Sequence, residues 1–440
     1  MRSVVRLSTA LLSSIAALSL ACADPERVSD PRSALSLDRT TAPGLGQACS
    51  DQPGLHLARR PNAPLELLCA FTLPSGSNPI LNGTKSWVDG GRYYLTELKN
   101  ASVYVFSVVT HANVGRVRGF VGAILNADGT TNAARSGPNS ITFTGDGHAW
   151  VSDGISAVRV VDLNSMAIVD SVSTAIAACD NGTVHNCQRT NEITYDPEDG
   201  IIFVQNPSPL SVTTGAAIDT YGTFIDAATH AVLGTITFAD RRGQEAPLWD
   251  PALHRILSAV SGRAVGSTIF QQYVAVINPH TRMMENHFDL DCHVLVGTAP
   301  GALFGINDPA LGADGHVVIP ACGHAVVFDA ATGTPFAVLT KIGGGNETWY
   351  NPGDNNFYVT GIDSTLSTPV NSLGVIDASS AAFLQGVPAL AATNPAAAAE
   401  NNQVFAVVPG NTAATTACTA FGFQASGCIL VFAHVPGAAN

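Results

Sequence analysis

Apolar and polar positions alternate along most of this chain in short runs, and the same pattern of runs recurs. In the clearest copies, an apolar pair and an Asp lead into a small polar turn and a second apolar run, as in FIDAATHAVLGTI (224–236) and VFDAATGTPFAVL (327–339). This pattern predicts a β-hairpin. Looser copies stand at 105–117, 160–172, 276–288 and 375–387. A hairpin repeated about every 50–60 residues is typical of a repeat architecture.

Most of these hairpins have an Asp or Asn at the start of the turn. An acid or amide stands at the end of the first apolar run, where its side chain can accept hydrogen bonds from the turn backbone. These positions are Asp162, Asp226, Asn278, Asp329 and Asp377.

A second sequence pattern precedes each hairpin. It consists of two predicted strands joined by a turn that contains Asx-Pro or Gly. Its copies are residues 85–97, 140–153, 192–206, 245–260, 347–361 and 391–408, with a shorter version at 311–321. Each unit therefore holds four strands, and four antiparallel strands per repeat predict a propeller blade.

The ends of the chain decide how many blades are expected. Six full units occupy about residues 85–388, and a seventh begins at residue 391 but lacks a fourth strand after GCILVFA (427–433). The run LELLCAFTLP (65–74) reads as a strand without a hairpin partner. If it completes the last blade, the ring closes and no sheet edge is left exposed. We therefore predict an all-β, seven-bladed β-propeller of four-stranded blades, with six blades as the alternative.

Composition agrees with this class and excludes others. Of the 440 residues, 46% are hydrophobic and 12% are charged, with 41 Gly and 25 Pro; the usual charged share is about 25%. The net charge of −13 argues against nucleic acid as a partner. No GxxxxGK[ST] or GxGxxG motif occurs, so we expect no nucleotide cofactor. The sequence also lacks HExxH and GxSxG.

The N-terminus predicts export. Residues 1–22 combine Arg2 and Arg6 with an apolar stretch and then Cys22, which reads as a lipoprotein-type signal with Cys22 lipidated. Cleavage after Ala23, which would release a soluble protein, is the alternative. Residues 23–64 are a polar tether and N-terminal extension, residues 65–436 the propeller and residues 437–440 a tail. We expect a protein of the bacterial cell envelope whose membrane contact is limited to the lipid anchor.

The other eight cysteines allow 105 pairings, and an oxidising compartment favours disulfides over a metal site. Loop locality predicts sequential pairs: Cys49–Cys69, Cys179–Cys187, Cys292–Cys322 and Cys418–Cys428.

The sequence also resembles a known group. EITYDPEDG (192–200), EAPLWDP (245–251), GGGNETWYNPGDNNFYVTG (343–361) and the VIDA-type hairpins look like bacterial exported YVTN-type β-propeller proteins, within the lactonase-like propeller assemblage. The resemblance covers nearly all of residues 65–436 and implies the propeller fold. That assemblage includes binding proteins, lyases and metal-dependent lactonases, so the resemblance does not fix an activity.

The repeats also predict a site. In a propeller the first strand of each blade lines the central channel. Glu192, Glu245 and Glu347 stand four or five residues before the turn Asx of their blades, and Lys85 stands at the equivalent place. The first, second, fifth and seventh blades offer no carboxylate there. We expect these groups to meet at the channel, with Arg189, Asn191, Gln244 and Trp349 beside them as channel or ligand-binding residues.

Three glutamates at one channel mouth stay solvated, keep a proton or bind a cation. Oxygen ligands suit Ca²⁺ or another divalent ion. The resemblance to lactonase propellers implies Glu192, Glu245, Glu347 and Asn346 as the ligands. A water-filled channel neutralised by Lys85 and Arg189 is the simpler alternative.

Two functions remain open on the sequence. We expect a lipid-anchored ligand-binding or scaffold propeller, a monomer, whose partner is a small molecule or an envelope protein. The alternative is a metal-dependent hydrolase of lactones or esters that uses the channel glutamates.

Overall fold

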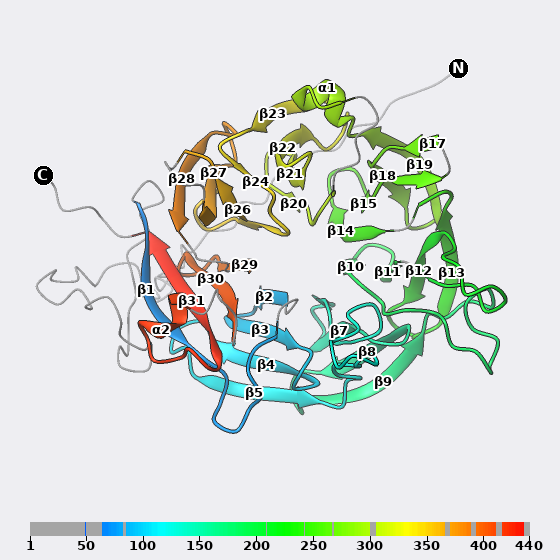
Figure 1. Cartoon of the computed structure of the whole chain (residues 1–440), viewed down its shortest axis with the longest axis horizontal. Coiled ribbons are helices and arrows are strands. Elements are labelled where there is room, and N and C mark those ends of the chain that lie inside the picture. The colour runs from blue at the N-terminus through cyan, green and yellow to red at the C-terminus, as the bar shows by residue number, and fades with distance from the viewer. Residues whose placement is uncertain are drawn as a thin grey trace, which may run out of the picture. The chain divides into compact units, whose positions relative to one another are not determined.

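The computed structural model describes residues 49, 64–81, 85–207, 209–241, 243–265, 268–299, 305–365, 370–388, 393–410 and 416–434. Seven antiparallel sheets are arranged around a common axis, with the first strand of each blade innermost (Figure 1). The predicted all-β propeller is confirmed, and the count is seven blades rather than six.

The first three blades are regular meanders of four strands. Blade 1 comprises β2 (Lys85–Asp89), β3 (Arg92–Glu97), β4 (Ser102–Ser107) and β5 (Asn113–Arg118). Blade 2 comprises β6 (Ile141–Phe143), β7 (His148–Asp153), β8 (Ala157–Asp162) and β9 (Ala167–Ser173). Blade 3 comprises β10 (Ile193–Asp196), β11 (Ile201–Asn206), β12 (Thr220–Asp226) and β13 (Val232–Phe238).

Blades 4 to 6 carry local irregularities. Blade 4 comprises β14 (Gln244–Asp250), β15 (Arg255–Val260), β18 (Tyr273–Asn278) and β19 (Met283–Asp289), with the hairpin β16 (Arg263–Val265) and β17 (Thr268–Phe270) inserted. Blade 5 begins with the two-residue β20 (Ala310–Leu311), followed by β21 (His316–Ala321), β22 (His324–Asp329) and β23 (Pro335–Leu339). In blade 6 both β24 (Ile342–Gly343) and β25 (Thr348–Asn351) pair with β26 (Asn356–Asp363), which continues to β27 (Val370–Asp377) and β28 (Phe383–Pro388).

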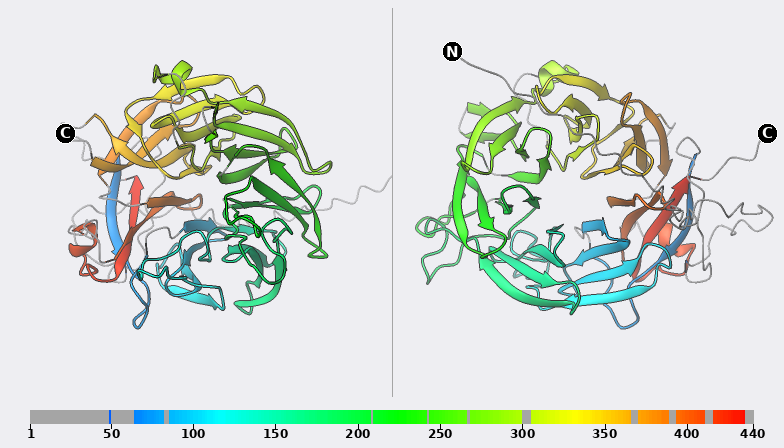
Figure 2. Two further views of the ribbon diagram at one scale, coloured as in Figure 1. Left: turned by 45° about the vertical axis from the view of Figure 1, so that its right-hand side comes forward. Right: turned by 180° about the vertical axis from the view of Figure 1, so that it is seen from behind.

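Blade 7 joins the two ends of the propeller. Its strands are β29 (Thr393–Ala398), β30 (Gln403–Pro409), β31 (Gly427–His434) and, from the N-terminal side, β1 (Leu65–Phe71). β1 runs antiparallel to β31, with Leu65 opposite His434 and Phe71 opposite Ile429. Both views in Figure 2 show this pair side by side. The predicted closure by the N-terminal strand is therefore confirmed.

The predicted turn chemistry is also present in the hairpins between the third and fourth strands. The Asp226 Oδ1 atom accepts hydrogen bonds from the backbone N–H groups of Ala228 and Thr229, at 3.0 and 2.7 Å. Asp162, Asn278, Asp329 and Asp377 accept equivalent bonds in their own turns. In blade 1 the Ser107 hydroxyl takes this role.

The core consists of one hydrophobic cluster between each pair of adjacent blades. The cluster between blades 7 and 1 is rich in aromatic rings, among them Phe71, Tyr93, Phe106 and Phe405. Six similar clusters fill the remaining seams. Each sheet therefore buries both faces against its neighbours, which explains why the second and third strands are near-continuous apolar runs.

All four predicted disulfides are present: Cys49–Cys69, Cys179–Cys187, Cys292–Cys322 and Cys418–Cys428. Four disulfides are typical of proteins from oxidising compartments. The short helices α1 (Cys292–Val296) and α2 (Thr416–Thr419) each contain one of these cysteines. Among the described residues, no helix has the length and apolar character needed to span a membrane. Cys22 and the predicted signal, tether and tail lie outside the described residues, apart from residues 49 and 64.

Candidate functional site

The candidate site is formed where the first strands of several blades approach the axis. Lys85 begins β2, Glu192 directly precedes β10, and Glu347 directly precedes β25. The chain reaches this position in blade 6 because Gly345 packs against the β26 backbone, where an added Cβ would collide with the Thr360 carbonyl.

Lys85 occupies the centre of a cluster of carboxylates. Its Nζ atom lies 3.0 Å from Glu192 Oε1 and 2.6 Å from Asp308 Oδ2, and it also contacts Glu347 Oε1. The Lys85 side chain is 13% exposed, and the three carboxylates are 3–9% exposed. Acids from blades 3, 5 and 6 therefore surround one ammonium group from blade 1.

Asp308 is the member of this cluster that the sequence analysis missed. Counting back four or five residues from the turn Asx does not find it, because it stands six residues before Asp314. Blade 5 has no carboxylate at the counted position, but it contributes Asp308 to the cluster from one residue further back. A usable signal existed, since an amide residue directly precedes the acid in all four cases: Asn191-Glu192, Gln244-Glu245, Asn307-Asp308 and Asn346-Glu347.

Backbone contacts hold Asp308 between its neighbours. Its N–H donates to the Asn346 carbonyl at 3.0 Å, and its Oδ1 atom accepts from the Ala246 N–H at 2.8 Å. Asp308 thus bridges blade 6, through its N–H, and blade 4, through Oδ1, while its Oδ2 atom contacts Lys85. Asn346, a predicted metal ligand, holds this bridge with its carbonyl, and its amide lies 3.4 Å from Glu347 Oε1.

Burial and charge control protonation in the cluster. Burial by itself lowers the pKa of Lys85, but Asp308, Glu192 and Glu347 outweigh it, so this pKa lies well above its usual value and the amine is charged. Burial raises the pKa of Glu192 against the opposing effect of Lys85. Burial, again opposed by Lys85 and reinforced by Asp308, raises the pKa of Glu347 well above its usual value. Lys85 therefore offsets only part of the cost of burying these acids.

The other predicted channel residues form a second network beside the cluster. Arg189 donates to the side-chain oxygens of Asn139 and Asn191, at 2.9 and 2.7 Å. The Asn191 amide donates to Glu245 Oε2 at 3.3 Å and to the Gln244 carbonyl at 3.1 Å. The structure therefore brings Arg189, Asn191 and Glu245 together. The Gln244 side chain is fully buried, and neither of its polar atoms has a hydrogen-bond partner among the described residues.

A cavity of about 230 Å³ opens above the Lys85 cluster. Its floor contains Lys85, Glu192, Asp308 and Glu347, and its walls include Trp87, Trp349, Tyr350, Pro247 and Leu311. The rings of Trp87 and Trp349 meet edge to face, with centroids 5.0 Å apart. We call this cavity the channel pocket. It combines a charged floor with aromatic and apolar walls, which is the usual composition of a small-molecule site.

One hydroxyl group in the pocket lacks a partner. Thr348 is 7% exposed, lines the channel pocket, and its hydroxyl oxygen makes no hydrogen bond to a described residue. Buried hydroxyls are normally satisfied. The Thr348 hydroxyl is therefore available to a ligand or to water in the pocket, whereas the hydroxyl of Ser140, which also lines it, interacts with Glu192.

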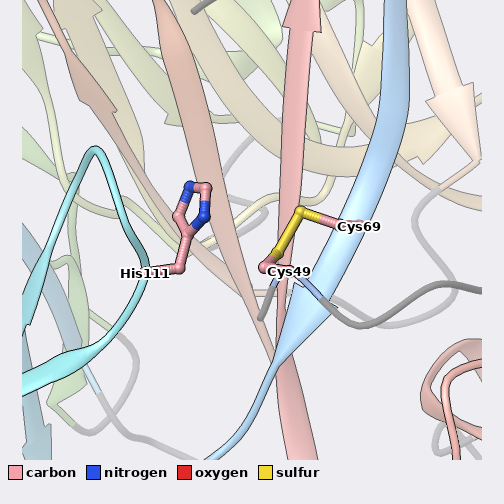
Figure 3. A group of neighbouring side chains, drawn as sticks. All are labelled: Cys49, Cys69 and His111. Carbon is pink, nitrogen blue, oxygen red and sulfur yellow. A yellow bond between two sulfur atoms is a disulfide. The ribbon is translucent and has the colours of Figure 1, made fainter. Parts of the chain in front are cut away.

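The geometry does not gather the glutamates into a ready divalent-ion site. Among the described residues, the one group of three or more His, Cys, Asp or Glu ligand atoms within 4.8 Å of one another is Cys49, Cys69 and His111. Figure 3 shows the His111 ring beside the bond that joins the two sulfurs, so these cysteines are already paired. In the channel, Lys85 Nζ stands among Glu192, Asp308 and Glu347, where an ion would be expected. The metal role of Glu192, Glu245, Glu347 and Asn346 stays a prediction.

We expect Glu245→Gln to change how stability depends on pH. Burial, followed by the negative charge of Asp308, raises the pKa of Glu245 to about 8. Between about pH 4.5 and 8 the folded protein keeps a proton that the unfolded chain has released, so this group makes stability fall as pH rises, by on the order of 1.4 kcal/mol per pKa unit at most. Glu245→Gln should flatten the decline seen in urea unfolding at pH 5 to 8.5.

Glu66→Gln is the matched control, because Glu66 is an exposed acid on β1. Parallel pH profiles for the wild type and both variants would show that Glu245 does not hold a proton in this range.

These features define the class of protein: a closed seven-bladed β-propeller with a polar, aromatic-walled pocket at its axis. No protein-family model and no curated protein matches the sequence. The resemblance to exported YVTN-type propellers therefore stays a prediction beyond the propeller fold itself.

Proposed function

We propose that this chain is an exported, lipid-anchored β-propeller that binds a small ligand in the channel pocket. The observation that carries this proposal is the channel pocket itself, in which a buried charged cluster, the unpartnered hydroxyl of Thr348 and the edges of two tryptophans converge. A propeller suits such a role because it is a rigid frame that places side chains from distant parts of the sequence at one axis.

The cellular setting is inferred separately from the pocket. Four disulfides agree with an oxidising compartment, and the N-terminal segment ending at Cys22 fits a lipoprotein signal. Labelling of cells with a fatty-acid analogue, comparing the wild type with Cys22→Ser, tests the anchor. Release of the Cys22→Ser protein into the soluble envelope fraction is the expected result, and an unlabelled wild-type protein would contradict it.

Ligand binding is favoured over metal-dependent hydrolysis because of Lys85. A divalent ion coordinated by Glu192, Asp308 and Glu347 would have to displace an ammonium that contacts all three. The three carboxylates as they are arranged suit an ammonium group. Thermal unfolding with Ca²⁺ and then with chelator tests the metal prediction: a rise in midpoint reversed by chelator would support a cation site.

The direct test is a screen of small cationic, neutral and anionic compounds by ligand-observed NMR. We expect hits that bind the wild type and lose binding in Trp349→Ala, since Trp349 forms a wall of the channel pocket. Trp249→Phe is the control, because Trp249 lies in β14 but does not line the pocket. The proposal fails if no compound of any charge binds, or if hits bind Trp349→Ala as well as they bind the wild type.

A further inference from the structure

The channel pocket has features that select among ligands by charge. Its floor holds three carboxylates, from Glu192, Asp308 and Glu347, against the one ammonium of Lys85. When all four groups are ionised, negative charge is in excess. Arg189 donates to Asn139 and Asn191 and does not line the pocket, although its charge also acts on Glu192 and Asp308 from outside it.

Lys85 does not use all the acceptor atoms of the floor. It contacts Oε1 of Glu347, and the Asn346 amide approaches the same oxygen. The hydroxyl of Thr348, which is more than nine-tenths buried, makes no hydrogen bond to a described residue. Together with the Glu347 carboxylate, which also lines the pocket, this hydroxyl gives the floor acceptors for an incoming N–H donor.

The walls suit the same kind of ligand. Trp87, Trp349 and Tyr350 line the pocket together with Pro247 and Leu311. Aromatic faces attract organic cations and pack against apolar bodies, whereas a hydrated metal ion gains little from them. The volume of about 230 Å³ is below the range of about 300–1,000 Å³ found for drug-sized ligands, so the ligand should be small.

We infer that the channel pocket binds a small organic ammonium ion that carries an aromatic or apolar body. This inference rests on the proposed ligand-binding function. The ammonium group lies over the floor and donates to Glu347 and Thr348, while the apolar body lies between the tryptophans and Leu311. The carboxylates that Lys85 does not fully neutralise provide the charge selectivity.

A matched set of three probes tests the charge selectivity: 2-phenylethylammonium, the neutral 2-phenylethanol and the anionic 3-phenylpropionate. By calorimetry on the wild type we expect the ammonium to bind at least about tenfold more tightly than the alcohol, and the anion to bind most weakly. The affinity of the ammonium should rise as pH increases above the usual carboxyl pKa, because burial raises the pKa values of Glu192 and Glu347 and a bound cation favours their ionised forms and releases protons.

Two variants and one control locate the effect. Glu347→Gln should reduce the preference for the ammonium over the alcohol by about tenfold. It should remain folded, because the amide resembles the protonated acid and Lys85 keeps two carboxylate partners. Trp349→Leu, which keeps an apolar wall, should weaken both ligands. Glu285→Gln, an exposed acid in β19 paired with Arg255, should change neither.

The outcomes separate this inference from the proposed function. If the alcohol or the anion binds as tightly as the ammonium, and Trp349→Leu still weakens binding, the ligand class is wrong and the proposed function stands. If Glu347→Gln leaves the preference unchanged, the charged floor does not select the ligand. If none of the probes binds and the broader screen also finds no ligand, both proposals fail.

Discussion

Replacing Phe71 by Ala is expected to lower the free energy of unfolding by about 3–5 kcal/mol, the usual cost of removing a buried aromatic side chain. Phe71 ends β1, is 6% exposed, and its ring contacts those of Tyr93, Phe106 and Phe405. These partners come from blade 1 and from blade 7, so the Phe71 side chain joins the two blades.

The substitution should also affect where unfolding begins. Phe71 belongs to the strand that closes the propeller, and β1 is joined to its blade by antiparallel pairing with β31. Removing the phenyl group between blades 7 and 1 weakens both the packing and this strand pairing, so unfolding should begin there. Hydrogen exchange should show faster exchange for β1, β31 and β2 in the variant, with little change in blades 3 and 4.

Phe336→Ala is the matched control, because Phe336 is a phenylalanine in β23 that is 55% exposed. Its truncation should change stability by less than about 1 kcal/mol. Equal losses for the two variants in chemical denaturation, or uniform exchange changes in Phe71→Ala, would show that the closing strand has no special role.

Replacing Lys85 by Met is expected to destabilise the protein by about 3–5 kcal/mol near neutral pH, because it leaves Glu192, Asp308 and Glu347 buried without their shared counter-charge. The three acids are 3–9% exposed, so water does little to compensate. Lys99→Met is the control, since Lys99 lies exposed in the turn after β3, and it should be close to neutral.

The loss should depend on pH in a defined direction. The pKa of Lys85 is raised in the folded protein, so its contribution is complete below the pKa of the unfolded lysine, near 10.5, and disappears as pH rises through the folded value. At acid pH the carboxyls of the variant take up protons and no longer need a partner. The gap between wild type and Lys85→Met should therefore be small at pH 4 and widen towards pH 8.

A second substitution tests the mechanism of this loss. Adding Glu347→Gln to Lys85→Met removes one of the unpaired charges, so the double variant should regain part of the stability at pH 8 and little at pH 4. Equal stability of Lys85→Met and wild type at pH 8 would contradict the description of Lys85 as the neutralising centre of the channel.

The sequence by itself determined the fold because the fold is repetitive. Each blade repeats the same local sequence features: short apolar runs, an Asx residue that accepts hydrogen bonds in the turn, and Gly or Pro between strands. The strand at residues 65–71 had no hairpin partner, and the last blade lacked a fourth strand after residue 434. Pairing the N-terminal strand with the last blade supplies both. Sequential disulfides followed from short loops, because cysteines close in sequence have few geometric alternatives.

The site was predictable only in part, because distances across the axis depend on how blades pack. Counting residues within each blade placed Lys85, Glu192 and Glu347 at the channel, and the structure brings them into contact. The same counting missed Asp308, because this acid stands six residues before Asp314 and not four or five, and it gave Glu245 the same role as the other glutamates. In the structure Glu245 instead joins Asn191. The turns and strands arise from interactions between residues near in sequence. The partners of Lys85, in contrast, lie more than a hundred residues away along the chain. Only the packing of the seven sheets into a closed ring decides which acids contact its ammonium group.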